Sequence, residues 1–187
     1  VGSLTANSER FMAWRTVDGE SIAPKGVPEL ETLINGVFDQ TRLLSLLRGF
    51  MVFENTGSDL IKKIAGYHQF HAVHKAVQCT INATDDSGDN RVGVIWHTQG
   101  SGKSYSMALF AQKVRRKLGG DFTFLILTDR QDLDNQIYKT FAGVGLADND
   151  KDPCRAESGT ALRELLSQHK AFIFTLVQKF NKEITEG

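Results

Sequence analysis

The stretch from Val92 to Ser104, VGVIWHTQGSGKS, decides the fold, because a short apolar run rich in β-branched residues passes directly into a glycine-containing loop. An apolar-periodic stretch follows, through Met107, Phe110 and Val114. This pattern predicts a strand, a loop and a helix in succession. Glycines let successive backbone N–H groups of such a loop point at phosphate oxygens, and the helix start adds the positive end of its dipole. The segment is therefore predicted to bind a nucleoside triphosphate.

The loop itself, GSGKS at residues 100–104, carries side chains suited to a triphosphate. Lys103 can reach the β- and γ-phosphates, and the Ser104 hydroxyl can ligate a Mg²⁺ ion that bridges them. The usual pattern has a glycine five positions before the second glycine, where this chain has His97. A flexible turn without a ligand is the alternative for the loop. His97 can contact phosphate or pack as a structural histidine.

Two further apolar runs lie downstream, FTFLILTD at residues 122–129 and AFIFTLV at residues 171–177. Near-continuous apolar runs are typical of parallel strands that are covered on both faces. Helical patterns follow the first run, at residues 132–141, and precede the second, near residues 162–169. Alternating strands and helices predict an α/β domain with a mainly parallel sheet and flanking helices. Three such strands would leave unpaired edges, so we expect a fragment of a longer protein.

Helical patterns dominate the part of the chain before the loop. Residues 28–50 show three- and four-residue apolar spacing twice, which predicts two consecutive helices. After a cap at residues 57–59, a third helix is predicted from about Leu60 to Ile81. Residues 1–27 show weak periodicity, and their aromatic stretch favours a truncated strand or an interdomain contact.

The composition excludes several classes of protein. Twenty-two basic and 22 acidic residues give no net charge, so any nucleic-acid surface must be local. The two cysteines, Cys79 and Cys154, are far apart, which indicates a reducing compartment without a disulfide framework. Apolar runs stay well below the roughly 20 residues of a membrane helix. We therefore expect a cytoplasmic protein that does not use a membrane.

Three segments together resemble the restriction subunit of type I restriction-modification enzymes, a superfamily 2 helicase-like DNA translocase with a nuclease domain. VGVIWHTQGSGKS resembles the first motor motif of that family, in which a histidine at the His97 position is usual. LTDRQDLDNQIYKTF at residues 127–141 resembles the next motif, and FTLVQKF at residues 174–180 the segment after it. The resemblance implies a RecA-like P-loop domain that binds ATP and Mg²⁺, with Lys103 as a catalytic residue. The implied ligand-binding residues are Gln99, Gly100, Ser101, Gly102, Lys103 and Ser104.

Two more site residues come from the resemblance. IAGYHQFHAVHKAV at residues 64–77 resembles the family's helix with an adenine-reading glutamine, which would be Gln69. A glutamine amide can donate to adenine and accept from it at once. Residues 128–130 resemble a segment on the DNA-facing side of the motor, which makes Arg130 a candidate contact for the DNA backbone. Capping of the strand end or an ion pair with Asp132 explains Arg130 equally well.

The resemblance also implies an order of domains. We expect residues 1–27 to close the nuclease domain or form a linker, and residues 28–82 to be a helical segment that leads into the motor. Residues 83–187 would be the N-terminal part of the first RecA-like motor domain, truncated. The nuclease carboxylates and the acidic motor motif of the family lie outside this sequence, so no residue here is assigned to those roles.

The implied function is the ATP-binding part of an ATP-dependent type I site-specific deoxyribonuclease, which couples ATP hydrolysis to movement along duplex DNA and to cleavage. The implied partners are duplex DNA and the modification (methyltransferase) and specificity subunits, in a prokaryotic cytoplasm. A P-loop phosphotransferase acting on a metabolite and a nucleotide-binding module are the alternatives. We expect no turnover from these 187 residues alone.

Overall fold

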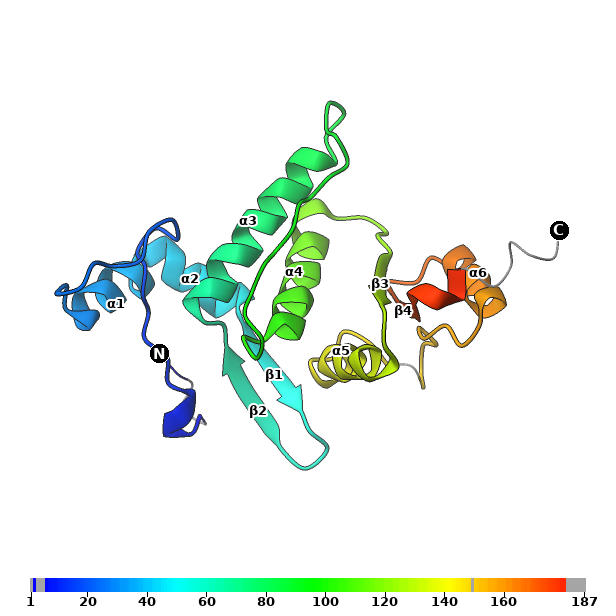
Figure 1. Ribbon diagram of the computed structural model, residues 1–187, viewed down its shortest axis with the longest axis horizontal. Coiled ribbons are helices and arrows are strands. Elements are labelled where there is room, and N and C mark those ends of the chain that lie inside the picture. The colour runs from blue at the N-terminus through cyan, green and yellow to red at the C-terminus, as the bar shows by residue number, and fades with distance from the viewer. Residues whose placement is uncertain (1, 3–5, 149, 181–187) are drawn as a thin grey trace. The chain divides into compact units, whose positions relative to one another are not determined.

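The computed structural model describes residues 2, 6–148 and 150–180, which form two compact units, Val1–Val114 and Arg115–Gly187 (Figure 1). Helix α4, Lys103–Leu118, begins in the first unit and ends in the second. It ends just before Gly119 and Gly120, both at positive φ, as the glycine stop in the sequence predicts. The mixed α/β class is confirmed, and the RecA-like arrangement stays a prediction.

The first unit combines helices with one antiparallel hairpin. The two helices predicted in residues 28–50 are confirmed, and the Asp39 carboxylate caps the second by accepting a bond from the Arg42 N–H at 2.9 Å. In chain order the elements are the short 3₁₀ helix η1 (Ser8–Arg10), α1 (Glu29–Val37), α2 (Gln40–Gly49), β1 (Met51–Asn55), β2 (Leu60–Ile64), α3 (Tyr67–Ala83) and α4.

The third predicted helix is wrong over residues 60–66, because Leu60–Ile64 is strand β2 and helix α3 begins only at Tyr67. Residues 51–55 pair with residues 60–64 in antiparallel register. The predicted cap at residues 57–59 is the hairpin turn, in which Gly57 takes a φ of +92° and its N–H donates to the Asn55 side chain at 2.8 Å. The apolar spacing of residues 60–64 suits a helix and a strand equally.

The strand predicted at residues 92–98 is also wrong, because the structure assigns no strand to this segment. Val94 and Trp96 are 92% and 89% exposed. A strand exists through ladder hydrogen bonds to a neighbour. Within residues 2, 6–148 and 150–180, the paired strands are β1 with β2 and β3 with β4, and neither pair includes this segment.

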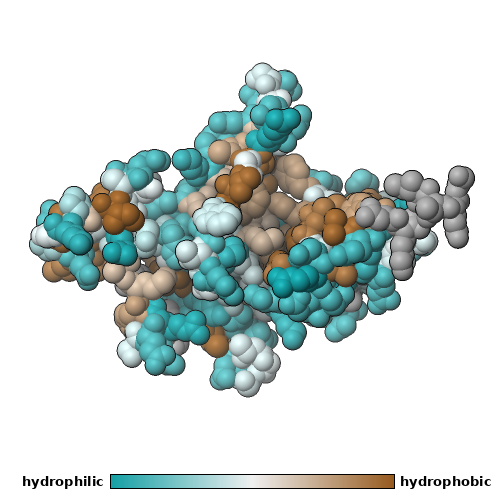
Figure 2. All heavy atoms as spheres, viewed as in Figure 1, coloured by the Kyte–Doolittle hydropathy of each residue, from teal (hydrophilic) through white to brown (hydrophobic). Residues whose placement is uncertain are grey.

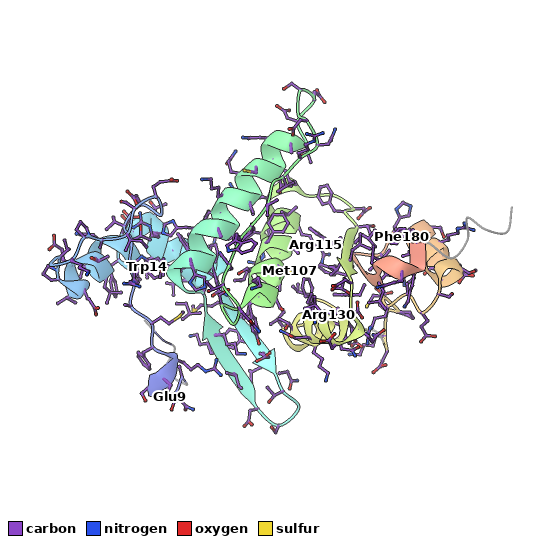
Figure 3. All side chains as sticks on the ribbon, viewed as in Figure 1. Glu9, Trp14, Met107, Arg115, Arg130 and Phe180 are labelled. Atoms are coloured by element: carbon purple, nitrogen blue, oxygen red, sulfur yellow. The ribbon has the colours of Figure 1, made fainter. Side chains whose placement is uncertain are left out.

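The N-terminal stretch is not a truncated strand. Instead Trp14 is buried against α3 of the same unit, with its ring edge-on to Phe70 at a centroid separation of 5.9 Å (Figure 3). The indole also occupies the space beside Gly36 of α1. On α1 itself, Leu30, Ile34 and Phe38 are exposed, and Figure 2 shows brown hydrophobic patches in this region. Of the aromatic stretch, Trp14 thus packs on the first unit, whereas Phe11 and Met12 stay 57% and 43% exposed.

The second unit is built on two parallel strands, β3 (Phe124–Thr128) and β4 (Phe172–Leu176), in a register that pairs Phe124 with Phe172. The parallel pairing predicted for the two downstream apolar runs is confirmed. Helices α5 (Gln131–Gly143) and α6 (Gly159–Ser167) also lie where the sequence predicts helices, and η2 (Val177–Phe180) follows β4. The core consists of aromatic and aliphatic side chains from α5, α6 and the strands, including Phe141, Ala156, Leu162, Leu165, Phe172, Ile173 and Phe174.

No helix in the described part of the chain combines the length and the apolar composition that a membrane span requires.

Candidate phosphate-binding site

The loop before α4 has the backbone geometry of an anion-binding turn. Gly100 and Gly102 both take a φ of +78°, the left-handed region that glycine enters without steric cost. A Cβ at Gly102 would lie 2.8 Å from the Gln69 Nε2 atom, whereas nothing lies within 4 Å of one at Gly100. Helix α4 begins at the next residue, Lys103, so the positive end of its dipole lies at the loop.

Lys103 is folded back onto the loop. Its Nζ atom donates to the carbonyl oxygens of His97, at 3.0 Å, and Thr98, at 2.8 Å. The ammonium is therefore held beside the turn while the side chain stays exposed to solvent. The next residue, Ser104, is 9% exposed in the first turn of α4. These are the two side chains that the sequence predicts for phosphate and Mg²⁺.

The start of α3 contacts the loop from the other side. The Gln69 amide nitrogen donates to the Gly102 carbonyl at 3.0 Å, and its Oε1 atom accepts from the Gly66 N–H at 3.0 Å. The His68 Nε2 atom lies 3.0 Å from the Ser101 carbonyl oxygen, to which it can only donate. Gln69 is 8% exposed, so its side chain is part of the site interior. The structure thus brings Gln69 together with the loop, as a ligand-binding role requires.

His97 lies at the entrance of the loop beside His68, with ring centroids 5.2 Å apart in an edge-on arrangement. Burial, together with the nearby His68 and Lys103, lowers the pKa of His97. Its Nδ1 atom and the Ser101 hydroxyl are buried without a hydrogen-bond partner among the residues that the structure describes. Two unsatisfied polar groups at one turn can bind a polar ligand or an ordered water.

The residues present fit a triphosphate with Mg²⁺. The loop offers positive-φ glycines, a cationic ammonium at Lys103, a serine hydroxyl at Ser104 and the N-terminus of a helix. Gln99 and Gly100 are exposed at the top of the turn. Carboxylate, hydroxyl and phosphate oxygens are the ligands that Mg²⁺ prefers, and Ser104 offers a hydroxyl oxygen of that kind at the start of α4.

Three residues near the site were not predicted, namely Glu54, Lys63 and Tyr105. Lys63 Nζ lies 2.5 Å from Glu54 Oε2 across the hairpin, and it also donates to the Tyr105 hydroxyl at 2.5 Å. Tyr105 immediately follows Ser104 in α4. The signal in the sequence was weak, because strand β2, which carries Lys63, was predicted as helix and no strand was predicted at β1.

The histidines of α3 have separate partners. His68 contacts the loop, His74 lies 3.1 Å from the Ser45 hydroxyl, and His71 packs against Trp14. The described residues contain no group of three or more histidine, cysteine, aspartate or glutamate side chains that could hold a metal ion.

Arg130 belongs to the second unit, where it is the N-cap of α5 (Figure 3). Its Nε atom lies 3.6 Å from Asp129 Oδ1, and both side chains are exposed. Its ion-pair partner is thus Asp129 rather than the predicted alternative, Asp132. The Gln178 amide donates to the Asp129 carbonyl at 2.7 Å, which joins the two segments that follow β3 and β4. Arg130 therefore remains available to an anionic ligand at the carboxyl end of the strands.

A loop of positive-φ glycines at a helix start, held by a neighbouring helix, is the geometry expected of a phosphate-binding loop. Comparison with protein families matches residues 68–186 to the SWI2/SNF2 ATPase family. The chain belongs to this family.

Curated relatives extend the comparison. The chain is 42% identical over 188 residues to the type I restriction enzyme HindI endonuclease subunit of Haemophilus influenzae, covering 96% of the chain and 18% of the relative. It is 32% identical over 203 residues to the putative type I restriction enzyme MjaIXP endonuclease subunit of Methanocaldococcus jannaschii, covering 97% and 18%. The resemblance to type I restriction subunits is confirmed, and the chain spans less than a fifth of these relatives.

The buried histidines predict a loss of stability in acid. Burial, with a smaller effect of Arg42, lowers the pKa of His71, and burial also lowers that of His97. Unfolded histidine binds a proton near its ordinary pKa of about 6.5, whereas these two folded residues resist it. Stability is thus complete above that pH and is lost as the pH falls through the folded pKa values.

We expect the melting temperature of the protein to fall between pH 7.5 and pH 5.5. The variant His71→Gln/His97→Gln should show a shallower fall, and the exposed control His169→Asn should match the parent. Thermal melts followed by circular dichroism at each pH check this. A parallel fall in all three proteins contradicts it.

Proposed function

We propose that this chain is the ATP-binding part of a type I restriction endonuclease subunit, which couples ATP hydrolysis to movement along duplex DNA and to DNA cleavage. One observation carries the proposal: the Lys103 ammonium, the positive-φ glycines and the buried Gln69 amide meet at a single turn. The family match and the relatives that are named as endonuclease subunits support it. The subunit would work in a prokaryotic cytoplasm.

Each residue has a role in this proposal. Lys103, which donates to the carbonyls of His97 and Thr98, would bind the β- and γ-phosphates, where its charge would stabilise the transferred phosphoryl group. Ser104 holds Mg²⁺, which neutralises phosphate charge when bound. The loop from Gln99 to Ser104 surrounds the phosphates through its N–H groups. Gln69, at the loop, contacts adenine.

The proposal includes the order of domains. Residues 1–27 would close the nuclease domain or form a linker, residues 28–82 would lead into the motor, and residues 83–187 would begin the first RecA-like domain. Arg130 would contact the DNA backbone, since its exposed guanidinium follows a parallel strand at the carboxyl edge of the sheet. The modification and specificity subunits would be the protein partners.

We expect Gln69 to contribute to the preference for ATP over GTP. Changing Gln69 to alanine in the full-length protein should raise the KM for ATP by about 10-fold, the loss expected for a hydrogen-bonding pair at a buried position. The preference for ATP over GTP should be smaller in the Gln69→Ala variant than in the parent. The matched control is Gln78→Ala on the same helix, because that amide bonds to Asn82 on the surface. Steady-state hydrolysis of both nucleotides checks the prediction, and equal KM values for both variants would contradict it.

A translocation assay on the full-length subunit, assembled with its modification and specificity subunits, tests the proposed function. A third DNA strand bound at a set distance from the recognition site should be displaced only with ATP, after a lag that grows with that distance. Transfer of phosphate to a small acceptor without any need for DNA would instead establish the phosphotransferase alternative. The isolated 187 residues should show no turnover.

A further inference from the structure

A three-residue contact joins the β1–β2 hairpin to the first turn of α4. Glu54 of β1 and Lys63 of β2 lie diagonally across the hairpin, since Glu54 pairs with Ile61 and Lys63 with Val52. The Lys63 ammonium lies 2.5 Å from Glu54 Oε2. The Tyr105 hydroxyl accepts from Lys63 at 2.5 Å and donates to Glu54 Oε1. All three polar groups are therefore satisfied by one another.

The contact is partly shielded from water, with the Glu54 and Lys63 side chains 16% and 35% exposed. Burial opposes ionisation of Glu54, but the bonds from Lys63 and Tyr105 outweigh it and lower the pKa of Glu54. Burial lowers the pKa of Lys63, but the bonds from Lys63 to Glu54 and Tyr105 outweigh burial and raise that pKa. Burial, and then donation to Glu54, raise the pKa of Tyr105, so its hydroxyl keeps its proton. The ion pair and its shared hydroxyl thus persist at neutral pH.

Such a partly buried pair adds little net stability, because desolvation of the two charges offsets their attraction. The contact instead fixes a geometry, because the carboxylate, the ammonium and the hydroxyl form their mutual hydrogen bonds only when all three are in place. The Lys63 ammonium also lies 4.3 Å from the centroid of the Tyr105 ring, which fixes the ring as well as the hydroxyl.

The position of Tyr105 links this geometry to the phosphate loop. Tyr105 follows Lys103 and Ser104 directly, and its N–H donates to the Gly102 carbonyl at 3.1 Å. That same carbonyl accepts the Gln69 amide. Strand β2 leads through residues 65–66 into α3 (Figure 1), so one continuous segment contacts α4 at Tyr105 and the loop at Gly102. Lys63 makes the first contact through Tyr105, and Gln69 makes the second.

We propose that Tyr105 is a positioning residue, which anchors the first turn of α4 to the hairpin through Glu54 and Lys63 so that Lys103 and Ser104 are placed for a nucleoside triphosphate. The inference rests on the proposed function, because it assigns a role within that ATP site. When the loop is already ordered before ATP binds, less of the binding free energy is lost in ordering it. Loss of the anchor should therefore weaken ATP binding more than the chemical step, because bound phosphates re-form the loop.

The test uses the full-length protein with Tyr105→Phe, which keeps the ring and removes only the hydroxyl. The KM for ATP should rise about 5- to 10-fold, while kcat at saturating ATP stays within about twofold of the parent. Glu54→Gln should act in the same direction, and the double variant should be no worse than the more affected single one. Tyr138→Phe is the matched control, because that ring packs on Phe174 in the second unit.

Two outcomes would overturn the inference. One is a KM for Tyr105→Phe equal to that of the control, and the other is a fall in kcat with unchanged KM, which partial unfolding produces because it lowers the active fraction. Lys103→Ala, measured alongside, separates this inference from the proposed function. If Lys103→Ala is inactive and Tyr105→Phe resembles the parent, the positioning role fails alone. If Lys103→Ala retains full hydrolysis, both fail.

Discussion

Replacing Lys103 with alanine in the full-length protein is expected to abolish DNA-stimulated ATP hydrolysis and, with it, DNA cleavage. The Lys103 ammonium is the cation at the turn, where it donates to the carbonyls of His97 and Thr98. In the proposed mechanism it stabilises charge on the transferred phosphoryl group. Removal of one such donor costs about 10²- to 10³-fold in rate. Hydrolysis assays with and without duplex DNA, and a cleavage assay on the same preparations, check this.

Lys117→Ala is the matched control, because Lys117 is an exposed lysine at the other end of the same helix. It should keep the activity of the parent. Lys103→Arg should also be strongly impaired, since a planar guanidinium does not reproduce a compact ammonium at the phosphates. Full ATP hydrolysis and cleavage by Lys103→Ala would contradict the assignment of the loop.

Gly102→Ala is expected to destabilise the ATP-free protein more than Gly100→Ala does. Both glycines take a φ of +78°, so both variants share the left-handed strain of about 1–2 kcal/mol. Only at Gly102 does the new Cβ meet another group, the Gln69 Nε2 atom at 2.8 Å. Because that amide is bonded at both ends, its displacement should add about 1–3 kcal/mol. Denaturant unfolding of the two variants measures the difference.

A second substitution shows whether Gln69 causes that difference. In a Gln69→Ala background the contact disappears, so Gly102→Ala and Gly100→Ala should then destabilise the protein equally. Equal unfolding free energies already in the parent background would show that the amide is free to move away. A difference that persists without Gln69 would place its cause elsewhere.

The loop could be predicted from the sequence because its chemistry is local. Glycines, a lysine and a serine between an apolar run and a helical pattern specify a turn whatever surrounds it, and the structure has positive φ at Gly100 and Gly102. The parallel pairing of β3 with β4 was also predictable, because buried parallel strands are apolar on both faces. The same signal failed at Val94 and Trp96, since an apolar run does not specify which strand pairs with it.

Residues that act through distant contacts could not be found in this way. The spacing of Leu60, Ile61 and Ile64 fits a helix and a strand alike, so the hairpin was missed and the Glu54–Lys63 pair with it. Tyr105 followed the loop in sequence, but its role depends on residues 42 and 51 positions away. Gln69 was assigned by resemblance alone, and composition alone would have predicted a surface residue.

The most direct measurement is the rate of ATP hydrolysis by the full-length subunit, in its complex with the modification and specificity subunits, with and without duplex DNA that carries the recognition site. We expect hydrolysis to depend on that DNA and to stop when Lys103 is replaced. Hydrolysis at the same rate without DNA, or ATP consumption that survives Lys103→Ala, would contradict a DNA-driven motor built on the loop from Gln99 to Ser104.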